Sequence, residues 1–244
     1  MNQKTDLKNN HHVIVKRTWI VAGISFILML LPLQEWSPIS SFFGLSLISL
    51  FIFMTSIVVV FIYKSREKKL QSLITGENLL AEWILTDEEK ENYINYLYKN
   101  EKNKNKGILF VIAVMSTIIF GIFILVIDEG KIFMLGVYAG LLIIMSLFAF
   151  GMPVYYRNSN RNGDGKILIG AKYAYINGYF HNWDYLFSGL SKVKIMKKPF
   201  YGINLVYYYT DRTLLHSEEL YIPANEEIDL EELVKSLKAL NDKK

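Results

Sequence analysis

The sequence predicts an integral membrane protein with four transmembrane α-helices in two hairpins, together with a small cytoplasmic α+β module. Gly107 to Ile127 is a run of 21 residues without a charge, about 30 Å long as a helix, which matches the hydrocarbon core of a bilayer. After a four-residue polar tip, Ile132 to Tyr156 is apolar again, so the two runs predict a hairpin. Beyond Arg157 the pattern changes to short alternating segments, which are typical of β-strands.

The composition fits such a mixture of membrane and water-soluble parts. The 244 residues are 52% hydrophobic and 20% charged, which is too apolar for a soluble domain and too charged for a chain lying wholly within a membrane. The net charge is only +4, and the basic residues flank the apolar runs instead of forming a stripe, so nucleic acid is not an expected partner. The absence of cysteine excludes disulfides, thiolate metal sites and cysteine nucleophiles.

An earlier pair of apolar runs, Thr18 to Leu33 and Phe42 to Tyr63, predicts a first transmembrane hairpin over residues 18–63. The tail before it, residues 1–17, is basic, whereas no Lys or Arg occurs between Arg17 and Lys64. The positive-inside rule therefore places the tail in the cytoplasm and the connecting loop outside. A secretory signal peptide is the alternative for the first run, but no small-x-small cleavage site follows it.

Residues 64–106 predict a cytoplasmic loop, because basic clusters stand at both of its ends. Within the loop, Thr86 and Glu89 fit a capping box, which predicts a short helix through Leu97 that lies on the membrane or on the β module. The tip of the second hairpin, residues 107–156, carries one Lys and two acids and is expected outside. Both termini are then expected in the cytoplasm, with the protein in the cell (plasma) membrane.

Residues 157–244 predict the β module. Asn158 to Gly165 is expected to be a flexible linker, and Asn177-Gly178 is a strong signal for a two-residue hairpin turn. Asp229 is the expected N-cap of a final helix whose stripe Leu233, Leu237 and Leu240 should be buried. The expected strands are Lys166 to Gly170, Tyr173 to Ile176, Tyr179 to Trp183, Leu190 to Met196, Ile203 to Thr210 and Glu218 to Ile222.

The run ILIGAKYAYINGYFHNWDYL, followed by LSKVKI, INLVYYYT and DLEELVKSLKAL, resembles the small bacterial pleckstrin-homology-like domains attached to membrane hairpins, including the YcxB-like group. The resemblance covers roughly the last third of the chain and rests on pattern and strand order. It implies a pleckstrin-homology-like curved antiparallel sheet capped by a C-terminal helix, with no catalytic residues to carry over. A seventh strand is not evident from the sequence.

No arrangement of residues predicts catalysis, a metal site or a cofactor. His181 and Asp184 are close in sequence, but no nucleophile is signalled nearby. The four apolar runs carry no ionisable residue, which disfavours proton relays and ion-coupled transport. The opening of a calcium-binding loop is imitated by Asn158, Asn160, Asn162 and Gly163. Such a loop needs a bidentate acid at its twelfth position, where this chain has Ile169. We therefore expect a protein that is not an enzyme.

Two surfaces of the β module are candidate binding sites. One is its densest basic patch, which would lie near anionic lipid headgroups and consists of Lys192, Lys194, Lys197 and Lys198. The other is an aromatic hairpin that could contact a protein partner, with Tyr179, Phe180 and Trp183. In the last apolar run, Gly136 and Gly140 form a GxxxG face that favours close helix packing, either within the monomer or in a homodimer.

These features predict a non-enzymatic multi-pass membrane protein whose β module binds lipid headgroups or a protein partner at the membrane surface. The alternative is a membrane sensor-effector or a toxin-immunity-type protein, in which the module receives a ligand or partner and acts through the transmembrane helices. A lipid-modifying enzyme has the least support, because it would require convergent acids, His or Ser at the interface.

Overall fold

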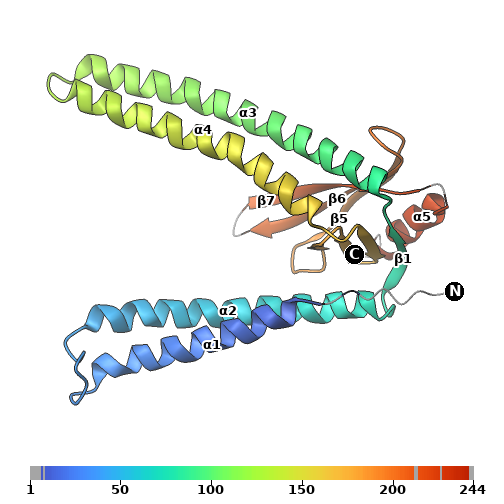
Figure 1. Cartoon of the computed structure of the whole chain (residues 1–244), viewed down its shortest axis with the longest axis horizontal. Helices are drawn as coiled ribbons and strands as arrows, with labels where there is room; N and C mark the ends of the chain where they lie inside the picture. The colour runs from blue at the N-terminus through green and yellow to red at the C-terminus, as the bar shows by residue number, and fades with distance from the viewer. Residues whose placement is uncertain (1–6, 8, 212–213, 226, 242–244) are drawn as a thin grey trace. The chain divides into compact units, whose positions relative to one another are not determined.

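The computed structural model describes residues 7, 9–211, 214–225 and 227–241. Helices dominate the first two thirds of the chain and strands dominate the last third (Figure 1). The elements in order are α1 (His11–Leu30), η1 (Leu31–Leu33), α2 (Phe43–Ile74), β1 (Leu79–Ile84), α3 (Asp87–Val126), α4 (Lys131–Arg161), β2 (Lys166–Gly170), β3 (Tyr173–Ile176), β4 (Tyr179–Asn182), β5 (Gly189–Met196), β6 (Gly202–Asp211), β7 (Leu214–Pro223) and α5 (Leu230–Asn241).

Four helical segments are long and apolar enough to cross a membrane, which supports the multi-pass, transmembrane character that the sequence predicts. They are α1 with η1, α2, α3 and α4. In the first hairpin, Ser46 donates a hydrogen bond of 2.9 Å to the carbonyl of Met29. In the second, the hydroxyls of Thr117 and Tyr138 lie 2.6 Å apart, so each pair of helices is joined by a polar contact as well as by apolar packing.

Three of these helices are longer than a bilayer requires. Helices α2, α3 and α4 have 32, 40 and 31 residues, or about 48, 60 and 46 Å, whereas the hydrocarbon core is about 30 Å thick. The short helix expected within residues 64–106 is the first half of α3, with the expected capping box between Thr86 and Glu89. Because neither Gly nor Pro occurs from Asp87 to Lys106, nothing ends the helix before the apolar run begins.

The segment expected to be a flexible linker after Arg157 is also largely helical, since α4 continues to Arg161. Asn160 is buried there, and its carbonyl accepts a 2.8 Å hydrogen bond from the side chain of Asn177. Asn177 has a positive φ of 47°, as its Asn-Gly turn requires, and its side-chain oxygen accepts a 2.9 Å bond from the amide of Gly165. One turn residue thus fixes the path of the chain out of α4.

The strands form a four-stranded sheet in the order β1-β2-β3-β4 and a three-stranded sheet in the order β5-β6-β7. All six expected strands are present, within a few residues of their expected ends. The seventh strand, β1, comes from the region expected to be a cytoplasmic loop. Strands β1 and β2 are neighbours in the sheet although the α3–α4 hairpin separates them in sequence, so the β structure does not begin at residue 157.

The chain divides into two compact units, each of which contains one helical hairpin. Unit one holds α1, η1 and α2, the chain as far as Glu82, and the segments Leu168–Tyr175 and Phe180–Tyr185. Unit two holds α3, α4, the segment Ile176–Tyr179 and the chain from Leu186 onward. The membrane helices and the strands therefore do not separate into different structural units.

In unit one, the end of α2 packs against the four-stranded sheet. Leu70 and Leu73 form a buried cluster with Leu168, Tyr173 and Phe180. A Cβ at Gly170 would lie only 2.8 Å from the side chain of Leu73, so a glycine is needed where the helix approaches the strand. The part of α2 that extends beyond its apolar run is thus fixed to the β structure.

In unit two, α5 covers the inner face of the three-stranded sheet. This face contains the pairs Val193–Leu205 and Ile195–Ile203, which are opposite each other in β5 and β6. Leu233 and Leu237 of α5 are buried as expected, but Leu240 is 49% exposed and does not belong to the core. The expected N-cap is present, because an Asp229 side-chain oxygen accepts hydrogen bonds of 3.0 Å from the amides of Glu231 and Glu232.

The start of α3 packs on the outer face of the same sheet, at the end where β6 begins and β7 finishes. The ring of Tyr96 meets Phe200 edge-on at 5.7 Å and Tyr221 at 5.0 Å. The indole of Trp83 donates a 2.9 Å hydrogen bond to the carbonyl of Pro223. The sequence predicted that this helix lies on the membrane or on the β module. In the structure it packs on the β module, and α3 is therefore fixed to the sheet.

Leu237→Ala should lower the free energy of unfolding of the β structure by about 2–5 kcal/mol, because a fully buried leucine leaves a cavity. Leu240→Ala is the matched control on the same helix and should change it by much less. Native-state proteolysis of the detergent-solubilised protein in increasing urea measures both. Equal effects of the two substitutions would contradict this packing.

Candidate functional site

The densest polar cluster of unit one surrounds Asp184, just after β4. The ammonium groups of Lys69 and Lys172 lie 3.1 and 3.0 Å from its carboxylate oxygens. Lys69 also donates a 2.9 Å hydrogen bond to the carbonyl of Asp184, and its ammonium lies 4.9 Å from the centre of the Tyr185 ring. Partial burial raises the pKa of Asp184, but the bonds from Lys172 and Lys69 outweigh it and hold that pKa below its usual value of 3.8.

A second basic residue of α2 has a similar role. The guanidinium of Arg66 donates a 2.9 Å hydrogen bond to the carbonyl of Phe180 and lies 5.6 and 5.7 Å from the ring centres of Tyr63 and Phe180. Arg66 and Lys69 belong to the basic cluster that the sequence assigns to membrane topology. The structure shows that both also attach α2 to β4, whereas Lys64 and Lys68 of the same cluster are exposed.

The second hairpin has an equivalent polar network where α3 and α4 leave their apolar runs. Arg157 donates a 3.0 Å hydrogen bond to Asn95, and its guanidinium lies 5.1 Å from the centre of the Tyr98 ring. Arg161 forms a 2.8 Å ion pair with Glu91. These contacts join the two helices outside the apolar segment, and each guanidinium is engaged by neighbours of the same hairpin.

The four lysines of the predicted basic patch are all exposed, two of them within β5 and two just beyond its end. Lys192 and Lys194 share the outer face of β5, on either side of the buried Val193. Lys197 and Lys198 follow the last residue of that strand, at the end of the sheet where α3 is attached. Within the part of the chain that the structure describes, none of the four pairs with an acid, so their charges remain available.

The predicted aromatic hairpin does not form an exposed surface. Phe180 and Trp183 are 8% and 1% exposed, and Trp183 donates a 3.1 Å hydrogen bond from its indole to the carbonyl of Ala171. Tyr179 is partly buried, with its hydroxyl donating a 2.6 Å bond to Ser159. Because Phe180 and Trp183 are core residues, they cannot be the contact surface for a partner in the folded protein. The burial of Phe180 follows the period-two alternation of β4, which sequence analysis could have used, whereas Trp183 lies just beyond the strand and its burial does not follow from that alternation.

The glycine face of α4 is not used for packing against α3. A Cβ at Gly136 or Gly140 would meet no heavy atom within 4 Å. Packing within this hairpin therefore does not explain the GxxxG spacing. A homodimer through this face stays a prediction.

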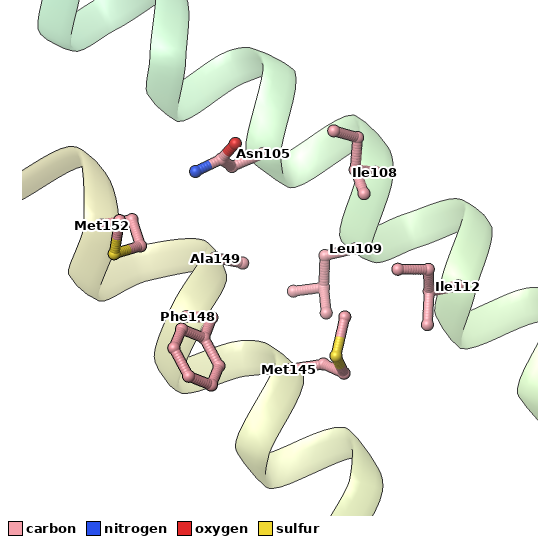
Figure 2. Close-up of a pocket in the computed structure, with 8 residues that line it drawn as sticks. All are labelled: Asn105, Ile108, Leu109, Ile112, Met145, Phe148, Ala149 and Met152. Atoms are coloured by element: carbon pink, nitrogen blue, oxygen red, sulfur yellow. The ribbon is translucent and has the colours of Figure 1, made fainter. Parts of the chain in front are cut away.

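A groove of about 160 Å³ lies between α3 and α4 within their apolar runs (Figure 2). Its lining is apolar apart from one amide and consists of Asn105, Ile108, Leu109, Ile112, Met145, Phe148, Ala149 and Met152. In a bilayer such a groove faces lipid hydrocarbon, and it offers no set of converging polar groups for chemistry.

A second pocket, of about 400 Å³, lies beside the attachment of α3 to the sheet. It is lined by Glu89, Asn92, Phe200, Tyr201, Pro223, Ala224 and Asn225. The carboxylate of Glu89 already accepts bonds from the amide and hydroxyl of Thr86, so it is occupied by helix capping. Among the described residues, no group of three His, Asp or Glu side chains could hold a metal ion.

Comparison of the chain with family models, with curated proteins and with solved structures found no match.

Asp184→Asn should lower the thermal stability of the protein near neutral pH, because it removes the carboxylate that both lysines bind. Since the folded pKa is below the unfolded pKa, this stabilisation is present above the unfolded pKa, near 3.8, and is lost as the pH falls through the lower folded pKa. The unfolding temperatures of the wild type and the variant should therefore become equal in acid. Thermal unfolding as a function of pH measures this, with Asp128→Asn in the connection between α3 and α4 as the matched control. A difference in unfolding temperature that persists in acid would count against the ion pairs.

Proposed function

We propose that this chain is a non-enzymatic, multi-pass protein of a bacterial cell membrane whose β module binds anionic lipid headgroups at the cytoplasmic surface. The observation that carries the proposal is the short, continuous helical connection between membrane and module. Tyr96, which contacts the sheet, precedes Gly107, where the apolar run begins, by eleven positions, or about 16 Å of helix. A module attached at that distance remains beside the lipid headgroups.

The proposal includes a pleckstrin-homology-like fold for the β module. The support is the number and order of its elements: sheets of four and three strands, followed by one helix. Strand β1 supplies the seventh strand, which the sequence does not make evident. The α3–α4 hairpin is then an insertion between the first two strands of the module.

The exposed lysines provide the contact with headgroups. A lysine near an anionic surface contributes about 1 kcal/mol, and the attraction is screened over about 8 Å at physiological ionic strength. Lys192 and Lys194 are well placed for such a role, since they lie on the outer face of β5 and no acid opposes them. The basic residues beside the apolar runs, such as Lys64 and Lys68, add to the attraction.

The distribution of Lys and Arg around the four apolar runs supports a cytoplasmic location of both termini and of the β module. Reporter fusions at Glu35 and at Glu129 should therefore give signals from outside the cell, and a fusion after residue 241 should give a cytoplasmic signal. A cytoplasmic signal from a fusion at either tip would reject this topology.

Adding phosphatidylglycerol to the detergent-solubilised full chain should raise its unfolding temperature more than adding phosphatidylcholine does. The difference should shrink in Lys192→Gln/Lys194→Gln and disappear at high salt, because exposed charge attraction is screened. Lys235→Gln/Lys238→Gln on α5 is the matched control, since α5 covers the opposite face of the sheet. Equal stabilisation of both double variants by phosphatidylglycerol, or stabilisation that ignores salt, would contradict headgroup binding by β5.

A further inference from the structure

Unit two exposes four large apolar side chains at one end of its sheet. Leu186 and Phe187 precede β5, Leu214 and Leu215 begin β7, and they are 82%, 70%, 64% and 71% exposed. The hydroxyl of Thr210 donates a 3.2 Å hydrogen bond to the carbonyl of Phe187, so the segment before β5 lies beside the end of the β6–β7 hairpin. We refer to Leu186, Phe187, Leu214 and Leu215 as the apolar tip.

The apolar tip lies beyond the core of the module. Successive residues of a strand point to opposite faces, yet Leu214 and Leu215 are both exposed, so neither face of the sheet is covered at this end. Phe187 also has a positive φ of 60°, a conformation that bulky residues rarely adopt, and it has no buried packing to offset that cost. A solvated turn would accept Gly, Asn or Ser at these positions, and four large apolar residues together therefore indicate a contact surface.

Aromatic residues follow the apolar tip along the hairpin. Tyr208 and Tyr209 of β6 are partly buried, and the ring of Tyr209 stacks on His216 of β7 at 5.6 Å. The first buried side chain of β7 is Leu220, deeper in the sheet. Rings with polar ends thus lie between the apolar tip and the core, and such side chains favour the interfacial layer of a membrane.

The hairpin also has the direction and length to reach the bilayer. It is attached to α3 at its open end, through Phe200 and Tyr221, and the pair Asp211–Leu214 is at the other end. Figure 1 shows β6 and β7 running from the start of α3 in the general direction of the apolar half of that helix. The ten residues of β6 span about 33 Å, twice the roughly 16 Å of helix between Tyr96 and Gly107.

We propose that the apolar tip inserts into the interfacial layer of the same bilayer that the helices cross. The inference rests on the position of the module beside the membrane given under the proposed function, but it does not depend on the lysines. The bilayer is the favoured occupant because the helices keep it within reach of the tip at all times, whereas another protein or a second copy must first be encountered. The tip gives the module a second attachment to the membrane, so its orientation is fixed at two points.

The chain contains no cysteine, so single cysteines can be introduced and labelled without first replacing native ones. Phe187→Cys and Leu215→Cys would carry an environment-sensitive fluorophore in the full chain, reconstituted in vesicles of phosphatidylcholine alone. Lys198→Cys, at the opposite end of the sheet, and Lys238→Cys, on α5, are exposed controls. Neutral lipid and 1 M salt remove the contribution of the lysines, which separates this test from that of headgroup binding.

We expect the labels at positions 187 and 215 to show a blue-shifted emission and several-fold stronger quenching by nitroxide-bearing lipid than the two controls, unchanged in 1 M salt. Leu186→Ser with Phe187→Ser should return the label at position 215 to the emission of the controls. Iodide quenching equal to that of the controls would overturn the proposal. Protection of the labels from iodide that disappears as the protein is diluted in lipid would also overturn it. That result would show that the apolar tip contacts a second copy of the chain.

Discussion

The structure depends on helices that continue without a break from their apolar runs into the β structure. Within hydrocarbon each backbone amide and carbonyl must be bonded inside its own segment, which makes the spans helical. Because no Gly or Pro interrupts the residues that follow the span in α2 or precede it in α3, the helices extend further and end in packed cores. Leu73 of α2 and Tyr96 of α3 lie in these contacts, so rigid helices and not flexible linkers hold the strands.

The same constraint explains how a helical hairpin can separate two neighbouring strands. An antiparallel helical pair returns the chain to the side from which it started, about 8–10 Å from its entry point, and neighbouring strands lie about 4.8 Å apart. Only short connections are therefore needed between β1 and α3 and between α4 and β2. Lys90 of α3 donates hydrogen bonds to the carbonyls of Arg161 and Gly163, and Asn177 bonds to Asn160, so these contacts close the hairpin at its base.

The basic residues beside the spans serve two purposes. The positive-inside rule counts them only as charges, but Arg66, Lys69 and Arg157 are bonded to carbonyls, carboxylates, amides or aromatic rings of their own unit. Others from the same clusters, such as Lys68 and Lys106, are exposed. A long basic side chain beside an apolar run can thus attach a helix to its sheet, because its apolar stem packs while its charged end finds an acceptor.

Local patterns in the sequence determined the four apolar helices, six strands, the Asn177 turn, and the caps at Thr86 and Asp229, because each depends on residues close together in the chain. The pairing of β1 with β2 and the partners of Arg66 and Lys69 depend on contacts between residues a whole hairpin or about a hundred positions apart. The burial of Phe180 against Leu70 and Leu73, and the gathering of Leu186, Phe187, Leu214 and Leu215 at one end of a sheet, have the same origin. Residues close together in the sequence decide whether a segment is a helix or a strand. Which side chains share one surface is decided only when the strands pair.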